Sequence, residues 1–334
     1  MDFRFEETQT LFAETVREML SRECTASELR SMIDEGKGSL PELWKNLAEI
    51  GVIGMTGSER VGGLGMTDID FVLIMEELGS VICPEIVLEH TAVAVPFLEK
   101  YGRKKVGDTL MSDFVSGEKK ISTGLGTSYV LEADSVDYLL LQNMDEIHLL
   151  PTEKTDLTQQ KSIDGTRRLF KVDWEPLEET QITKSESILE ETTLSGTTAA
   201  AAQCIGVAKH LLNETIEYVK EREQFGKPVG VNQAVKHHLA DTGKAIEFAR
   251  PMVYRGAWAI SNDDDQKASA VAMAKFLASK AVDHACKTSL QCHGAIAYTM
   301  EYDLQLWMKR GWALSASWGN ATVQRERVAE RLSV

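Results

Sequence analysis

The sequence predicts a mostly helical protein with a small β-rich domain in its middle, and three stretches of different hydrophobic periodicity predict it. Up to about Ser116, apolar residues recur at the spacing of α-helices. From Ile121 to about Thr183 they alternate or form short runs, as strands do. After Glu190 the helical spacing returns. We therefore expect an amino-terminal helical domain, a small β-domain and a carboxy-terminal helical bundle, at residues 1–117, 118–186 and 187–334.

The amino-terminal region carries two amphipathic stripes and one buried helix. The stripes consist of Leu11, Phe12, Val16, Met19 and Leu20, and of Leu43, Leu47 and Ile50. Residues 69–75 are apolar almost all round, which predicts a helix buried on every side. We expect Glu76 and Glu77, which follow it, to be structural through caps or arginine pairs.

The middle region reads as strands separated by turns. Apolar runs occupy residues 136–141 and 147–150, and Phe170, Val172 and Trp174 alternate with polar neighbours. Turn-forming residues at 143–146 and 164–165 separate them. These features predict a small sheet.

The most informative segment joins two long helices of the carboxy-terminal region. A helical pattern from about Thr192 should end where Gly226 and Pro228 follow it. Asn232 is a suitable N-cap for a second helix, which should run to about Ala259 with its apolar face formed by Val235, Leu239, Ile246, Phe248 and Val253. Arg222 and Phe225 should therefore lie at the end of one helix, and Gln233 at the open amide end of the next. That arrangement predicts a site for a phosphate and a ring.

Composition excludes some classes of partner. With 36 Lys and Arg residues against 51 Asp and Glu residues, the formal charge is −15, which argues against nucleic acid or an anionic membrane surface. The first residues carry neither a basic segment nor an apolar run, and no later run is long enough to span a bilayer. We expect a soluble, cytoplasmic protein whose five scattered cysteines are reduced.

The helix junction resembles a known family. The pattern Arg222-x-x-Phe225-Gly226-x-Pro228, followed by Gln233, is similar to the FAD-binding helix junction of acyl-CoA dehydrogenases. Two further segments agree. Residues 291–301 resemble that family's Gln-x-x-Gly-Gly-x-Gly signature, with alanine at the second and third glycine positions, and residues 58–65 with 76–79 resemble its amino-terminal motifs.

The resemblance implies a fold, a cofactor and the residues that bind it. The fold has an amino-terminal helical domain, a reduced β-barrel or sheet domain and a carboxy-terminal four-helix bundle. The cofactor is FAD, and no metal is implied. The cofactor-binding residues would be Arg222, Gln224, Phe225, Gln233, Gln291, Gly294 and Ala295. In this family a neighbouring subunit supplies such residues to the adenosine diphosphate half of each FAD. The segment at 121–127 lacks the family's Thr-Glu-Pro motif, so this chain is expected to lack contacts to the flavin ring.

The catalytic base of the family is missing from both of its usual positions. These enzymes remove a proton α to a thioester while a hydride leaves the β-carbon, and a glutamate accepts the proton. An ungapped count places Trp318 at the usual glutamate position and Gly196 at the alternative one. An indole cannot accept a proton, and glycine has no side chain. No catalytic residue is therefore assigned to this chain.

The preferred hypothesis is a base-less, FAD-binding subunit of a heteromeric α2β2 acyl-CoA dehydrogenase. A longer homologue would bring the glutamate, an acyl-CoA of fatty-acid or steroid side-chain β-oxidation would be the substrate, and an electron-transfer protein would be the acceptor. One alternative is a self-sufficient homotetramer that uses Glu190 or Glu191. Another is a flavin-free scaffold, indicated by Ala295 and Ala297 in place of glycines. His293 is interpreted as a packed side chain, and the pair His237-His238 is given no role.

Overall fold

The computed structural model describes residues 4–331 and divides into two compact units. Unit 1 comprises the chain up to Ala26, Val72–Cys83 and the chain from Ala200 on; unit 2 comprises Ser27–Phe71 and Pro84–Ala199. The predicted first and last domains also include residues 1–3 and 332–334, which lie outside the described residues. The three-domain division stays a prediction.

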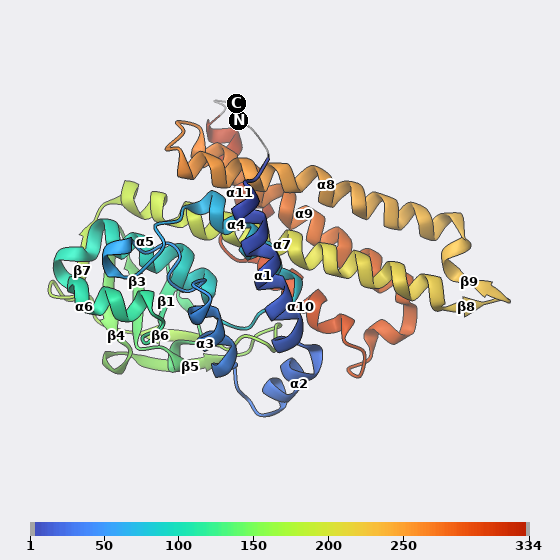
Figure 1. Cartoon of the computed structure of the whole chain (residues 1–334), viewed down its shortest axis with the longest axis horizontal. Coiled ribbons are helices and arrows are strands. Elements are labelled where there is room, and N and C mark those ends of the chain that lie inside the picture. Colours follow the sequence, from blue (N-terminus) through green and yellow to red (C-terminus); the bar gives the residue numbers. More distant parts are fainter. Residues whose placement is uncertain (1–3, 332–334) are drawn as a thin grey trace. The chain divides into compact units, whose positions relative to one another are not determined.

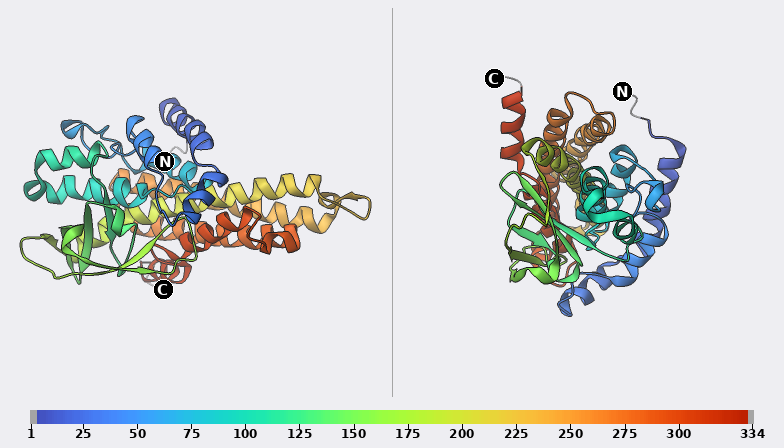
Figure 2. Two further views of the ribbon diagram at one scale, coloured as in Figure 1. Left: turned by 90° about the horizontal axis from the view of Figure 1, so that it is seen from below. Right: turned by 90° about the vertical axis from the view of Figure 1, so that its left-hand side faces the viewer.

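Unit 1 is helical, and its long helices run side by side (Figures 1 and 2). It contains α1 (Glu7–Glu23), most of α4 (Asp68–Ser80), the second part of α7 (Glu186–Glu221), α8 (Gln233–Ser261), α9 (Lys267–His293), α10 (Leu304–Ala316) and α11 (Ala321–Arg331). The strands β8 (Glu223–Gln224) and β9 (Lys227–Pro228) form a hairpin between α7 and α8. Two 3₁₀ turns, η6 (Val229–Val231) and η7 (Gly294–Tyr298), border the same end.

Backbones of unit 1 approach closely where α4 crosses α7. A Cβ atom added at Gly206 would lie 2.0 Å from the carbonyl oxygen of Glu76, and one added at Gly79 would lie 2.3 Å from that of Gln203. Only glycine fits at these two positions.

The two glutamates of α4 form ion pairs, as expected. Glu76 accepts hydrogen bonds from Arg250 and from the Tyr254 hydroxyl, both at 3.0 Å. Glu77 binds Arg17 through two hydrogen bonds of 2.8 and 2.7 Å. The pairs of Glu76 tie α4 to α8, and those of Glu77 tie it to α1, so the structural role predicted for both residues is confirmed.

Unit 2 contains short helices and the sheets. Its helices are α2 (Ala26–Asp34), α3 (Pro41–Glu49), η1 (Glu59–Val61), η2 (Leu88–Ala94), α5 (Val95–Phe97), η3 (Leu98–Gly102), α6 (Arg103–Val115), η4 (Ala133–Ser135) and η5 (Thr152–Lys154). Its strands are β1 (Ile121–Gly124), β2 (Tyr129–Leu131), β3 (Tyr138–Asn143), β4 (Glu146–Pro151), β5 (Asp156–Gln160), β6 (Leu169–Asp173) and β7 (Gln181–Lys184).

The strands form two sheets of different order. The first has the order β1-β3-β4-β7, with β1 parallel to β3 and the other pairs antiparallel. The second has the order β2-β6-β5 and is antiparallel. Leu139, Leu140 and Leu141 of β3 are all buried, which explains the continuous apolar run in the sequence. Within residues 4–331 neither sheet closes into a barrel, so the predicted fold class is confirmed in its sheet form.

Two predictions about helix faces were wrong. Leu11 is 61% exposed on α1, whereas Val16, Met19 and Leu20 of the same stripe are buried. Phe248 is 72% exposed on α8, while Ile246 and Val253 are buried. An isolated apolar side chain at the edge of an amphipathic stripe is not required to face the core, because exposed apolar residues are common on protein surfaces.

Candidate functional site

The junction between α7 and α8 is a hairpin, not the glycine-terminated helix end that the sequence predicted. α7 stops at Glu221, and Phe225 and Gly226 form the turn between β8 and β9. Both have positive φ, 54° and 76°, as in a type I′ turn. The hairpin is closed by the amide of Val229, which donates to the carbonyl of Arg222 at 2.8 Å. Phe225 therefore lies beyond the helix, at a hairpin tip, with 99% of its surface exposed.

The predicted start of the next helix is confirmed. α8 begins at Gln233 with Asn232 as its N-cap residue, although the Asn232 side chain donates to the carbonyl of Val229 instead of capping an amide. Gln233 itself is not among the residues that line the pocket described below, whereas Ala234 and Val235 of the same first turn are. The amide end of α8 thus borders the pocket, where its partial positive charge favours an anion.

The third side of the site is the end of α9. Gly294 follows the last residue of this helix with φ 67° and ψ −140°, a conformation open to glycine alone. Its amide already donates to the carbonyl of Leu290, so it is not a free donor for a ligand. Open space surrounds the position where a Cβ would stand, so a ligand can approach the backbone closely.

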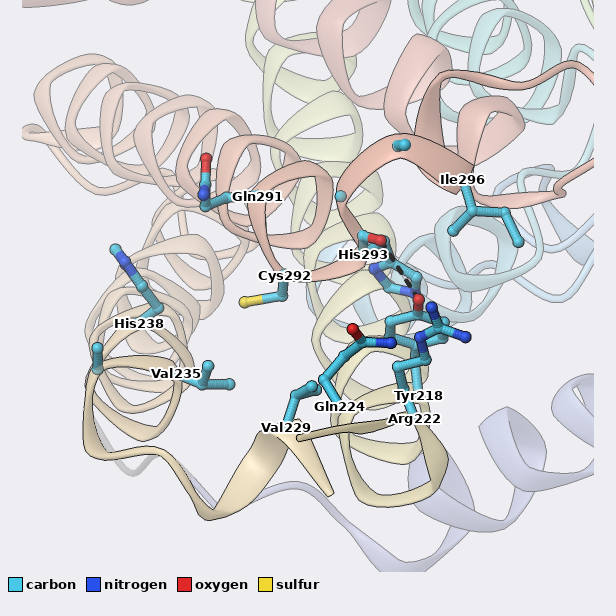
Figure 3. Close-up of a pocket in the computed structure, with 13 residues that line it drawn as sticks. Tyr218, Arg222, Gln224, Val229, Val235, His238, Gln291, Cys292, His293 and Ile296 are labelled. Carbon is cyan, nitrogen blue, oxygen red and sulfur yellow. Dashed lines mark hydrogen bonds between the residues drawn. The ribbon is translucent and has the colours of Figure 1, made fainter. Parts of the chain in front are cut away.

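These three segments enclose a pocket of about 470 Å³. Figure 3 shows Arg222, Gln224 and Tyr218 on one side and His238 and Val235 on the other. The lining consists of Tyr218, Arg222, Gln224, Val229, Ala234, Val235, His238, Gln291, Cys292, His293, Gly294, Ala295 and Ile296. A pocket of this volume is large enough for a nucleotide-sized ligand.

The lining combines positive charge with apolar surface. Arg222 contributes a guanidinium, and no aspartate or glutamate is among the residues that line the pocket. Val229, Val235 and Ile296 add apolar side chains. Burial raises the pKa of the Cys292 thiol, which is therefore protonated at neutral pH. The pocket is suited to a ligand with an anionic part and a flat apolar part.

His293 is packed, as the sequence indicated, but it also lines the pocket. Its ring stacks on Tyr218 with centroids 4.1 Å apart, and Nδ1 lies 2.8 Å from the carbonyl oxygen of Ser289. The Tyr218 hydroxyl donates to the His293 carbonyl at 3.3 Å (Figure 3). Burial lowers the pKa of His293, so the ring is neutral at neutral pH.

The structure brings together five of the seven residues expected to bind the cofactor. Arg222, Gln224, Gln291, Gly294 and Ala295 line one pocket. Phe225 and Gln233 do not line it. Among the described residues, none of the lining groups belongs to a cluster of three or more side chains that could hold a metal ion.

The sequence reasoning missed several lining residues, of which Tyr218 and His238 are the clearest. Tyr218 and His238 could both have been predicted from the spacing of residues along their helices. Tyr218 lies one turn before Arg222 on α7, and His238 lies one turn after Ala234 on α8, so each shares a face with a lining residue.

The loop after α10 contains Trp318, which the sequence count aligned with the family's catalytic glutamate. Trp318 adopts a positive φ of 54° there, and its carbonyl oxygen accepts a hydrogen bond of 2.9 Å from Gln324. Gly319, with φ 86°, completes the turn. The indole supplies no group that accepts a proton.

A self-sufficient enzyme was expected to use Glu190 or Glu191 as its base. These two carboxylates have different environments in unit 2. Glu191 is held by Lys100 at 2.7 Å and by the Tyr101 hydroxyl at 2.8 Å, so its oxygens are engaged in an ion pair. Glu190 is exposed to solvent. The sequence reasoning did not consider Asp68, which is hydrogen-bonded to Ser195, the residue before Gly196. Desolvation raises the pKa of Asp68 to about 6, in the range of a general base.

Comparison with known families gives matches to most of the chain. The model of the acyl-CoA dehydrogenase C-terminal domain matches residues 188–333. The model of the acyl-CoA dehydrogenase N-terminal domain matches residues 6–118. The match to the C-terminal domain includes all seven expected cofactor-binding residues and Trp318.

Among curated proteins, the chain is similar to the acyl-CoA dehydrogenase IpdE2 of Mycolicibacterium smegmatis, with 28% identity over 91% of this chain and 92% of that protein. It is 25% identical to the probable acyl-CoA dehydrogenase YngJ of Bacillus subtilis, over 99% of this chain and all of that one.

Solved structures share the fold. Butyryl-CoA dehydrogenase from Megasphaera elsdenii has a TM-score of 0.89 at 20% identity, over the whole of both chains. A chain of the ChsE4–ChsE5 complex from Mycobacterium tuberculosis has a TM-score of 0.88 at 20% identity, over 100% of this chain and 99% of that chain.

Proposed function

Because this chain belongs to the acyl-CoA dehydrogenase family, we propose that it is the base-less subunit of a heteromeric member, and that it holds the adenosine diphosphate half of FAD. The complex would carry out α,β-dehydrogenation of an acyl-CoA thioester. The partner, a longer homologue, would supply the glutamate and the contacts to the flavin ring.

One observation carries the proposal: a pocket that suits the anionic half of a dinucleotide occurs in a chain with tryptophan at the usual position of the base. Arg222 and the amide end of α8 provide positive charge for a pyrophosphate. Gly294 leaves room for close approach, and Val235 and Ile296 offer apolar contact to a ring. FAD, when bound, supplies the acceptor for a hydride.

The flavin-free scaffold is less well supported. Ala297 is buried and does not line the pocket, so its methyl group takes no space from a ligand. Ala295 lines the pocket, but a single methyl group leaves about 470 Å³ open. The replaced glycines therefore do not block the site.

Assembly with a partner is supported by the hairpin tip. An aromatic side chain that is 99% exposed and held in a left-handed conformation contributes little to its own unit. Phe225 would therefore be available for contact with a neighbouring chain. The ChsE4–ChsE5 complex shows that this fold occurs in complexes of two different chains.

The environment of the Asp68 carboxylate supports a second candidate function, that of a self-sufficient acyl-CoA dehydrogenase. Two observations support it: the pKa of Asp68 is raised to about 6, and its carboxylate is hydrogen-bonded to Ser195, which precedes Gly196 in the sequence. This role would replace the one that the sequence offered to Glu190 or Glu191.

Anaerobic reduction of bound flavin by a panel of acyl-CoA thioesters separates the two functions. We expect no bleaching for the chain supplied with FAD alone, because Trp318 cannot take the α-proton, and bleaching for the chain with its partner. Bleaching by the chain alone that disappears in Asp68→Asn would establish the self-sufficient enzyme. Glu191→Gln is the matched carboxylate control, since its carboxylate is engaged by Lys100 and Tyr101.

A further inference from the structure

His238 is exposed to solvent and lines the pocket, unlike the other member of the pair His237-His238. It lies on α8 one turn after Ala234, and Figure 3 shows it with Val235 on the side of the pocket opposite Arg222. His237 is exposed as well, but it does not line the pocket. A ligand held in the pocket is therefore close to His238 and not to His237.

The charge of the pocket wall depends on the protonation of His238. An arginine such as Arg222 is charged at every pH of interest, whereas histidine is the side chain that ordinarily changes charge between pH 5 and 8. No aspartate or glutamate lines the pocket, so no carboxylate of the wall neutralises a protonated imidazole. Protonation of His238 therefore adds a second positive side chain to that of Arg222.

The groups that α7, α9 and the hairpin bring to this region behave differently from an exposed imidazole. Burial lowers the pKa of His293, so this ring gains its proton only at a lower pH, and burial raises the pKa of the Cys292 thiol. The Tyr218 hydroxyl donates to the His293 carbonyl at 3.3 Å. Two exposed carboxylates near the end of α7, Glu221 and Glu223, do not line the pocket.

Charged groups also lie further along α8 and α9. Asp241, three residues after His238, is bonded to Lys244 at 2.7 Å, which lowers the pKa of this carboxylate. His284 of α9 also acts on Asp241 electrostatically, so it lies near this part of α8. Lys287 of α9 is exposed, and a lysine keeps its charge between pH 5 and 8. His284 is therefore the second histidine that an experiment must separate from His238.

We infer that protonation of His238 strengthens binding of the anionic ligand in this pocket, so that the adenosine diphosphate half of FAD is held more tightly as pH falls from 8 to 5.5. The inference rests on the proposed function, because it takes this diphosphate as the anion. A positive charge at the pocket wall attracts a pyrophosphate without direct contact, since Coulomb interactions act over several ångström. By linkage, binding of the anion favours the protonated imidazole to the same extent. Binding is therefore accompanied by uptake of protons.

Calorimetry with ADP-ribose and FAD, on the full-length chain alone and with its partner, tests the inference. Both pyrophosphates are esterified at each end and keep their charge between pH 5.5 and 8, whereas the terminal phosphate of ADP titrates in this range. We expect roughly 3–10-fold tighter binding at pH 5.5 than at pH 8. Titrations at pH 6.5 in two buffers of different ionisation enthalpy would measure the proton uptake, which should be a fraction of one proton per ligand.

Two substitutions of His238 change its charge in opposite ways. His238→Gln should bind at every pH with the affinity that the wild type has at pH 8, and it should take up no proton. His238→Lys carries a permanent charge, so it should bind at pH 8 as tightly as the wild type does at pH 5.5. His237→Gln and His284→Gln are the matched controls, because neither residue lines the pocket, and both should keep the wild-type pH dependence.

The outcomes separate the inference from the proposed function. If the wild type binds equally well at pH 5.5 and pH 8, or if His238→Gln keeps the pH dependence, His238 has no such role while the proposed function stands. Loss of the pH dependence in His284→Gln alone would also overturn the inference. If neither the chain nor its complex binds ADP-ribose or FAD at any pH, both the inference and the proposed function are overturned. Melting temperatures would check that each variant is folded.

Discussion

Arg222 is the only guanidinium among the residues that line the pocket, and its place there follows from where α7 ends. Arg222 follows the last residue of α7, and its amide still donates to the carbonyl of Tyr218 in the helical manner at 2.8 Å. A charge-assisted contact from such a position is stronger than a neutral hydrogen bond. Arg222 should therefore contribute much of the affinity for an anionic ligand.

Arg222→Ala should weaken FAD binding to the assembled protein by roughly 1.5–3 kcal/mol. Flavin release would be measured by fluorescence, with the melting temperature as the check on folding. Lys220→Ala is the matched control, because Lys220 is exposed on the same helix, pairs with Glu217 at 2.6 Å and does not line the pocket. Equal affinities of Arg222→Ala and the wild type would make Arg222 a solvated surface cation.

Asp68 should make the stability of the chain depend on pH. Its pKa is about 6 in the folded chain against 3.8 in the reference state, so the folded state binds more protons between these values. The free energy of unfolding contributed by this group therefore falls as pH rises through that range. Asp68→Asn should be more stable than the wild type by about 1–3 kcal/mol at pH 8, and the difference should vanish below pH 4.

Urea unfolding from pH 4 to pH 8 would measure this difference. A constant difference between Asp68→Asn and the wild type at every pH would show that the carboxylate is not desolvated in the folded chain.

At the scale of elements, the β8–β9 hairpin is the part of the α7–α8 junction that the sequence did not predict. The long helices, the start of α8 at Gln233 and the strands β3, β4 and β6 were predicted from periodicity and turn residues. The hairpin was not, because Gly226 before a proline reads as a helix end, and phenylalanine rarely adopts the left-handed conformation found at Phe225. The pocket was predicted in part. Gln233 was expected to line the pocket, but Ala234, the next residue along α8, lines it instead.

Phe225→Asn should raise stability and lower the flavin content of the assembled protein. Asn-Gly is the preferred pair for a type I′ turn, so relief of the left-handed strain should add about 1 kcal/mol to the free energy of unfolding. Loss of the exposed ring should reduce FAD retention after assembly.

Met144→Asn is the matched control. Met144 is also a turn residue with positive φ (52°) and is 85% exposed, but it lies between β3 and β4. It should gain stability without any change in FAD content. An unchanged FAD content in Phe225→Asn would show that Phe225 does not contribute to FAD retention.

At the scale of the whole molecule, the fold and the chemistry were predictable to different extents. Three motifs spread along the chain predicted the family, and the matches to residues 6–118 and 188–333 confirm it. The environments of Asp68 and His293 were not predictable, because each arises from contacts with residues distant in sequence, such as Ser195 and Tyr218. The structure has no helix among residues 4–331 that is long and apolar enough to cross a membrane. The cytoplasmic location stays a prediction.

The amount of FAD bound per chain tests most directly whether this protein supplies half of a shared site. The chain would be purified alone and after co-expression with a candidate partner, a longer acyl-CoA dehydrogenase homologue that has the catalytic glutamate, and flavin absorbance would be compared with protein concentration. The account predicts little FAD on the chain alone and about one FAD per heterodimer, because each cofactor needs residues from two different chains. One FAD per chain in the isolated homo-oligomer would contradict it.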